Sequence, residues 1–305
     1  MFLVGAERSG STLLRRMLAR HPQIAMVGDF RFVANAISPD GRVMKRDAFV
    51  RALELDPLFA RSRLTIPPGL TFVGIANDFL DQAATPKNAT VVGATVHHHF
   101  DRLLRLWPDA RFIHLVRDGR DVAMSTIPMG WAGNMWRGIR EWVEIEELWA
   151  RLSAKLPIER QITVKYEMLA SDPEYELRRI THFLALDFRP EMLRDERGAT
   201  YSAQPGDSVG KWRDVHPAEL GAAEHRAARW LLQNGYVLSG SVRKPSILRR
   251  IALRLQDRLA IALHRKSRFG TRLWLASVYT RRFGSRTAMD RLTRQQNEII
   301  RREMQ

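Results

Sequence analysis

Residues 2–13 read Phe-Leu-Val-Gly-Ala-Glu-Arg-Ser-Gly-Ser-Thr-Leu, and this stretch decides the fold. Phe2–Gly5 is an apolar run that ends in glycine, and a helical pattern of apolar residues starts at Leu13. The order predicts a buried strand, a tight loop and a helix. The loop has the spacing GxxxxG followed by Ser and Thr, which is typical of a phosphate-binding loop.

The chemistry of this loop favours an anion. Successive backbone N–H groups and the N-terminus of the next helix attract negative charge. A nucleotide-triphosphate loop has Lys directly after the second glycine, but here that position is Ser11 and the cation is Arg8. We therefore expect the loop to bind a terminal anionic group without a bridging metal ion. A glycine-containing turn that binds nothing is the alternative.

Working outward, short apolar stretches alternate with helical patterns. Strands are expected at 2–5, 24–28, 91–95, 111–117 and 161–165. Further helices are expected at 45–55, 69–84, 100–107, 136–156 and 173–186. The alternation predicts an α/β fold, a doubly wound parallel sheet with a P-loop-like phosphate-binding loop. We expect residues 1–242 to form this domain and residues 243–305 to form a helical extension.

A second polar loop follows the strand expected at 111–117. Arg117 ends that strand, and Ser125 lies about two helical turns further on. Ligands of open parallel sheets bind outside the carboxyl ends of the strands, so Arg117 is expected where a second phosphate would lie. Alternatively, residues 118–121 form only a salt-bridged helix start, which leaves the pairing of Arg117 with Ser125 unexplained.

Composition excludes several classes of protein. The 305 residues are 45% hydrophobic and contain no cysteine, which argues for a folded core and excludes disulfide scaffolds and thiolate metal sites.

No signal peptide or membrane-spanning stretch is evident, so a cytoplasmic protein, soluble or peripherally attached to membrane, is expected. The net charge is +16, and residues 243–305, with 17 basic and four acidic residues, carry +13 of it.

Four motifs together resemble those of the sulfotransferases that use 3′-phosphoadenosine-5′-phosphosulfate (PAPS), in particular the branch of tyrosylprotein sulfotransferases and bacterial relatives. The motifs are Arg8–Arg15, Val116–Arg120 with Ser125, Val164–Glu167, and Gly210–Arg213. The resemblance spans about Phe2 to Tyr236. It implies sulfuryl transfer from PAPS to a hydroxyl or amine acceptor, with adenosine 3′,5′-bisphosphate as product and no metal ion.

The resemblance also implies which residues bind PAPS. The first loop would hold the 5′-phosphosulfate, Arg117 and Ser125 the 3′-phosphate, and Tyr166 would lie near the adenine nucleotide. The implied set is Ala6, Glu7, Arg8, Ser9, Gly10, Ser11, Thr12, Leu13, Arg117, Ser125, Tyr166, Ser208, Lys211 and Trp212. Arg8 is also expected to be catalytic, because its guanidinium can follow charge that builds on the bridging oxygen.

Two positions compete for the base that takes the acceptor's proton. By the resemblance, Asp29 stands where tyrosylprotein sulfotransferases have their catalytic Glu, although Asp is also a common helix N-cap. His97 or His98 is the rival, because histidine has the better-placed pKa. A lysine found near this strand in many relatives is absent from Gly93–Thr95. A metal cluster at the histidines is disfavoured, since no carboxylate motif accompanies them.

Other functions stay open. A P-loop kinase would need the missing loop lysine, and a catalytically silent membrane adaptor would not need the arginines. The acceptor, a small molecule, glycan, lipid or peptide that carries a hydroxyl, is expected to bind at the variable helical stretches 30–56, 65–84 and 127–149. In the extension, Leu248, Ala252, Leu255, Leu259 and Leu263 recur at helical spacing beside a row of Arg250, Arg254 and Arg258. This pattern is typical of a helix that binds an anionic membrane surface. Alternatively, the apolar residues pack on the body of the protein or on a second copy in a homodimer. Binding of nucleic acid by the extension is less favoured, because the extension shows no nucleic-acid-binding motif.

Overall fold

The computed structural model describes residues 1–194 and 208–303. Five strands form one parallel sheet in the order β2-β3-β1-β4-β5. They are β1 (Phe2–Val4), β2 (Ile24–Asp29), β3 (Val91–Val96), β4 (Phe112–Val116) and β5 (Gln161–Lys165). Every predicted strand is present with bounds that differ by at most one residue, and the predicted α/β class is confirmed.

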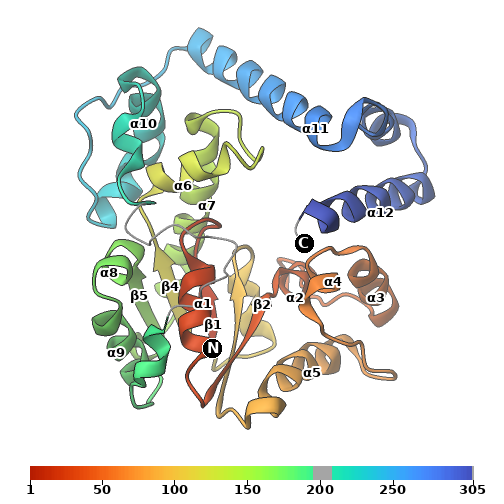
Figure 1. Cartoon of the computed structure of the whole chain (residues 1–305), viewed down its shortest axis with the longest axis vertical. Coiled ribbons are helices and arrows are strands. Elements are labelled where there is room, and N and C mark those ends of the chain that lie inside the picture. Colours follow the sequence, from red (N-terminus) through yellow and green to blue (C-terminus); the bar gives the residue numbers. More distant parts are fainter. Residues whose placement is uncertain (195–207, 304–305) are drawn as a thin grey trace.

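Helices connect the strands and cover the sheet (Figure 1). The longer ones are α1 (Ser11–Ala19), α3 (Arg46–Leu55), α5 (Phe72–Ala84), α6 (Gly119–Thr126), α7 (Met135–Ser153), α9 (Pro173–Phe183) and α10 (Pro217–Gln233). The shorter ones are α2 (Arg31–Asn35), α4 (Phe59–Ser62) and α8 (Tyr166–Ser171). The helix predicted at 100–107 is instead a 3₁₀ helix, η2 (Phe100–Arg105), a form used in short connections.

The sheet has two buried faces, as the period-2 geometry of its strands requires. In β1, Leu3 belongs to a core that includes residues of α1, α8 and α9. Its neighbours Phe2 and Val4 belong to the other core, with residues of α5, α6, α7 and α10. Because both faces are covered, the carboxyl ends of the strands form the open edge at which loops can bind a ligand.

Residues 243–305 form a helical extension that contacts the body along its length, beginning with the Arg243 N–H, which donates to the Gly221 carbonyl at 3.1 Å. Helix α11 (Ile247–Phe283) packs beside α7, and α12 (Arg286–Glu303) returns to the region of α3 (Figure 1). Asn297 Nδ2 donates to the Leu55 carbonyl at 2.9 Å. At Gly270, φ of +75° and ψ of 159° break the helical backbone and divide α11 into two segments.

Candidate active site

The loop after β1 is closely packed. Gly5 has φ of +145°, and a Cβ there would lie 2.2 Å from the Leu115 carbonyl oxygen. Gly10, at φ of +94°, lies against the Tyr166 ring, which a Cβ would approach to 2.3 Å. Both positions therefore require glycine. This close packing places the loop directly at the N-terminus of α1, as the GxxxxG spacing predicts.

Arg8 is held in an uncommon conformation inside this loop. Its φ is +70°, a left-handed value that costs free energy for a residue with a side chain. Its Nε donates to Ser125 Oγ on α6 at 2.8 Å. Next to it, Ser9 is buried, and its Oγ has no hydrogen-bond partner among the described residues. A strained arginine beside an unsatisfied buried hydroxyl indicates a ligand site.

Arg117 contacts three segments at the carboxyl edge of the sheet, namely those that contain Arg8, Tyr166 and Ser208. Its Nη1 donates to the Arg8 carbonyl at 2.9 Å, and its Nη2 donates to the Ser208 carbonyl at 2.6 Å. The guanidinium carbon lies 4.6 Å from the centre of the Tyr166 ring, and the Tyr166 hydroxyl is 2.7 Å from Ser208 Oγ. The buried Arg117 Nε has no partner in the part of the chain that the structure describes. The predicted residues of both phosphate sites are thus brought together.

The segment at residues 208–213, which we call the late loop, is fixed to the start of α6. Asp121 Oδ2 accepts the Gly210 N–H at 2.7 Å, and Oδ1 accepts the Trp212 N–H at 3.1 Å. Burial raises the pKa of the Asp121 carboxyl, while these two bonds oppose the rise. Trp212 stacks over the guanidinium of Arg120 at 3.5 Å, whereas Lys211 is exposed. The sequence offered no signal for Asp121, because its partners lie 89 and 91 residues away.

The salt-bridged helix start also exists, beside the site. Arg120 pairs with Asp118 at 2.7 Å and with Glu224 at 2.6 Å. All three side chains are buried. The ion pairs of Arg120 and the contacts of Arg117 are therefore both present, so the salt-bridged helix start is not an alternative to the site at Arg117.

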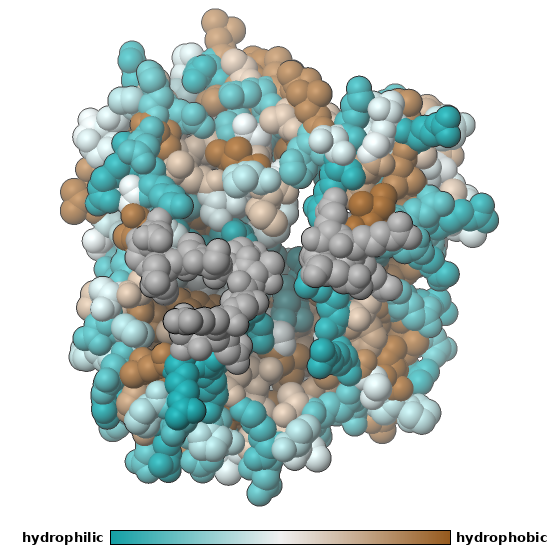
Figure 2. All heavy atoms as spheres, in the orientation of Figure 1, coloured by the Kyte–Doolittle hydropathy of each residue, from teal (hydrophilic) through white to brown (hydrophobic). Residues whose placement is uncertain are grey.

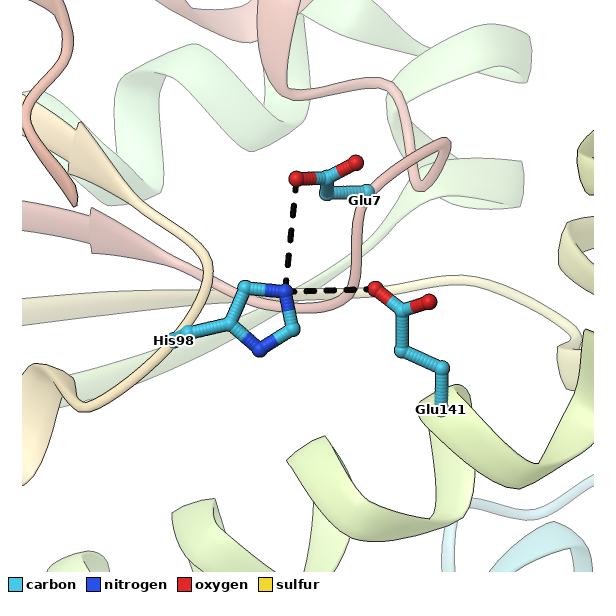
Figure 3. A group of neighbouring side chains, drawn as sticks. All are labelled: Glu7, His98 and Glu141. Atoms are coloured by element: carbon cyan, nitrogen blue, oxygen red, sulfur yellow. Dashed lines mark ion pairs between the residues drawn. The ribbon is translucent and has the colours of Figure 1, made fainter. Parts of the chain in front are cut away.

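The adjacent histidines point to different partners. His97 is buried, with Nδ1 2.8 Å from the Gly5 carbonyl oxygen and Nε2 3.4 Å from Ser11 Oγ. His97 therefore contacts both ends of the loop after β1 and stabilises its conformation. His98 is about one-third exposed, and its Nε2 lies 3.2 Å from Glu141 Oε1 on α7 and 4.0 Å from Glu7 Oε1 (Figure 3). Its hydrogen bond with Glu141 is the main cause that raises the pKa of His98.

Asp29 lies at the end of β2, on the same edge. Its Oδ1 accepts the Arg31 N–H at 3.0 Å, while the N-cap of α2 is Phe30. Arg31 in turn reaches Glu7, with Nη1 3.2 Å from Oε1. Asp29 is thus joined to the first loop through Arg31 and Glu7, and either Asp29 or His98 remains a candidate for the base.

Carboxylates do accompany the histidines, contrary to the sequence argument against a metal cluster. Ligand atoms of Glu7, His98 and Glu141 all lie within 4.8 Å of one another. Glu7 comes from the first loop and Glu141 from α7, so no local motif could reveal the group. The always-charged guanidinium of Arg31 already contacts the Glu7 oxygen that faces His98. We therefore interpret the group as a charged hydrogen-bonding network.

Two pockets of about 390 Å³ adjoin these residues. One lies behind the late loop, between Asp118, Glu167, Trp212 and Tyr236. The other opens from His98 along α7. Its lining residues are His98, Thr126, Trp131, Ala132, Arg137, Gly138, Arg140, Glu141 and Glu144. Seven of these nine lining residues belong to 127–149, one of the stretches expected to bind the acceptor, while His98 and Thr126 lie outside it.

Comparison with known proteins identifies the family. Residues 1–190 match the sequence model described as Sulfotransferase family. The chain is similar to Protein-tyrosine sulfotransferase 2 of Gallus gallus, with 24% identity over 215 residues that cover 64% of this chain and 53% of the relative. It is 22% identical over 258 residues to Protein-tyrosine sulfotransferase A of Caenorhabditis elegans, covering 77% and 67%. The chain thus spans about half of the first relative and two thirds of the second.

Solved structures share the fold. The Sulfotransferase Domain from the Curacin Biosynthetic Pathway superposes with a TM-score of 0.55 and 20% identity, over 78% of this chain and 97% of that one. The Sulfotransferase Domain from the Synechococcus PCC 7002 Olefin Synthase gives 0.57 and 22%, over 76% and 93%. With a family match that covers more than half of its length, this chain belongs to the sulfotransferase family.

Proposed function

We propose that this chain is an enzyme that transfers the sulfuryl group of PAPS to a hydroxyl acceptor. One observation supports the proposal most strongly. Two arginines lie next to each other at the carboxyl edge of the sheet, where Arg117 Nη1 donates to the Arg8 carbonyl at 2.9 Å. A ligand with two separate anionic groups, such as PAPS with its 5′-phosphosulfate and 3′-phosphate, matches two such cations.

In this proposal the residues at 6–13 hold the 5′-phosphosulfate with their backbone N–H groups. The guanidinium of Arg8 faces the bridging oxygen, where negative charge grows as the S–O bond breaks. Ser125 orients that guanidinium through the bond to Nε. Arg117 would hold the 3′-phosphate through its buried Nε, and the late loop with Ser208, Lys211 and Trp212 would close over the nucleotide.

His98 is the base that we propose. Glu141 accepts from its Nε2 and fixes the ring, so the other ring nitrogen would take the proton from the acceptor hydroxyl. Asp29 is the rival. Comparing Asp29→Asn with His98→Ala at saturating PAPS separates them: a large loss of kcat only in the histidine variant supports His98, and the reverse moves the role to Asp29.

The pocket along α7 is the proposed acceptor site, and its lining favours a neutral polar molecule. Arg140 pairs with Glu144 at 2.6 Å and Arg137 with Asp257 of α11 at 3.2 Å, so little net charge is left to attract an ion. Trp131 is 43% exposed, and its ring can stack on a sugar face. Labelled transfer to methyl glycosides, phenols and tyrosine peptides tests this, and preference for an acidic peptide would contradict it.

A nucleotide-binding assay separates this function from the alternatives. A sulfotransferase should show a thermal shift with adenosine 3′,5′-bisphosphate and little with ATP–Mg²⁺, whereas a kinase should show the opposite. No shift with either ligand would support a silent adaptor. The proposal includes turnover without a metal ion and a cytoplasmic location.

A further inference from the structure

The first segment of α11, residues 247–269, has one face fixed to the body. Leu253 and Asp257 are buried there. Asp257 accepts from the Gly133 N–H at 2.8 Å and from Arg137 Nε at 3.2 Å, and Asn134 Nδ2 donates to the Leu253 carbonyl at 2.8 Å. These contacts fix the rotation of the helix about its own axis, and with it the residues that face outward.

The opposite face is apolar and exposed. Its residues are Leu248 (79% exposed), Ile251 (47%), Leu255 (59%), Leu259 (62%) and Leu263 (57%), and we call it the α11 leucine face. At about 100° per residue they fall within an arc of about 120° centred away from Leu253 and Asp257. Figure 2 shows hydrophobic side chains along the outer edge of the molecule where α11 runs. A continuous outward stripe of this kind marks an interaction surface.

Basic side chains border the stripe. Arg254, Arg258 and Arg265 are exposed and follow one another at helical spacings of four and seven residues, which places them along one edge of the leucine face. The whole extension carries 17 basic and four acidic residues. The leucines noted in the sequence therefore form one amphipathic surface with Arg254, Arg258 and Arg265, whereas Arg250 of the expected row is only partly exposed.

The positive charge of the extension decides which partner the α11 leucine face can bind. A second copy would bring another strongly positive extension against this one, whereas an anionic surface complements it. Among the described residues, no helix is long and apolar enough to cross a bilayer. A helix with an apolar stripe beside arginines binds in the plane of the membrane interface. We propose that the α11 leucine face binds the headgroup region of an anionic bilayer, an interaction that does not depend on the sulfuryl transfer proposed above.

The test is flotation of the full chain with vesicles of phosphatidylcholine containing 30% phosphatidylglycerol, against pure phosphatidylcholine vesicles. The wild type should float with the anionic vesicles only, and less at high salt. The double variant Leu255→Gln/Leu259→Gln should weaken binding at least tenfold, because it removes two exposed anchors. The variant Arg258→Glu should also weaken it, through charge. In a matched control, Ile158→Gln/Leu232→Gln changes two exposed apolar residues on the body (81% and 58% exposed) and should bind as the wild type does.

Three results would overturn the proposal. One is a wild type that does not float with anionic vesicles at low salt. Another is a Leu255→Gln/Leu259→Gln variant that binds these vesicles as strongly as the wild type. The third is a wild type that is dimeric by light scattering and a variant that is monomeric, which would make the face a subunit interface. The thermal shift with adenosine 3′,5′-bisphosphate, measured on every variant, reports the nucleotide site separately, so failure of one proposal is distinguished from failure of the other.

Discussion

Replacing Arg117 with alanine tests the proposed nucleotide site most directly. Its Nη1 and Nη2 donate to the Arg8 and Ser208 carbonyls, and those bonds shape the site for any nucleotide. Its Nε is buried without a partner among the described residues and is therefore the N–H available to a 3′-phosphate. A hydrogen bond to a charged acceptor contributes about 1.5–3 kcal/mol, which corresponds to about a 10- to 150-fold change in Kd.

The assay is calorimetric titration with adenosine 3′,5′-bisphosphate and with 5′-AMP, which lacks the 3′-phosphate. Loss of the two carbonyl contacts should weaken both ligands alike. Loss of the Nε contact should weaken only the bisphosphate, so the preference for it over 5′-AMP should fall about 10- to 150-fold. Arg102→Ala is the matched control, because Arg102 also donates to a main-chain carbonyl, that of Ile37, at 2.7 Å. An Arg117→Ala variant with the wild-type preference would refute the assignment.

Three further predictions concern catalysis. Arg8→Ala should lower kcat by about 10²- to 10³-fold, because the proposed role of the lost charge is to stabilise the transition state, and near-normal turnover would remove Arg8 from the mechanism. Glu141→Gln removes the main cause of the raised pKa of His98. If the neutral ring of His98 is the base, as proposed, the acid limb of the kcat/KM profile should move to lower pH, and an unmoved limb would separate Glu141 from the base. Activity should survive EDTA, and loss that Mg²⁺ or Zn²⁺ restores would identify Glu7, His98 and Glu141 as a metal site.

Local features of the fold and site were predictable from the sequence. The strand and loop at 2–13 carry their own hydrophobic pattern and glycine spacing, and Arg117 directly ends an apolar strand. These signals lie within a few residues of one another, and the structure places them where the pattern requires.

Partners brought together by the tertiary fold could not be predicted. Glu141 meets His98 only because α7 packs across the edge of the sheet, and Asp121 meets the late loop from about 90 residues away. The different orientations of His97 and His98 follow from backbone direction at the end of β3, which composition does not encode. For the same reason, helical periodicity found the leucines of α11 but could not tell whether they face the body or solvent.

The ion pair between Arg137 and Asp257 links the proposed acceptor pocket to the extension, because Arg137 lines the pocket and Asp257 belongs to α11. Any ligand that alters this pair acts on both sites, and thermodynamic linkage makes the effect reciprocal. If bilayer binding shifts α11 and thereby raises affinity for the acceptor, the acceptor must raise affinity for the bilayer by the same factor. A single buried carboxylate would then give the enzyme a higher affinity for its acceptor at the membrane than in free solution.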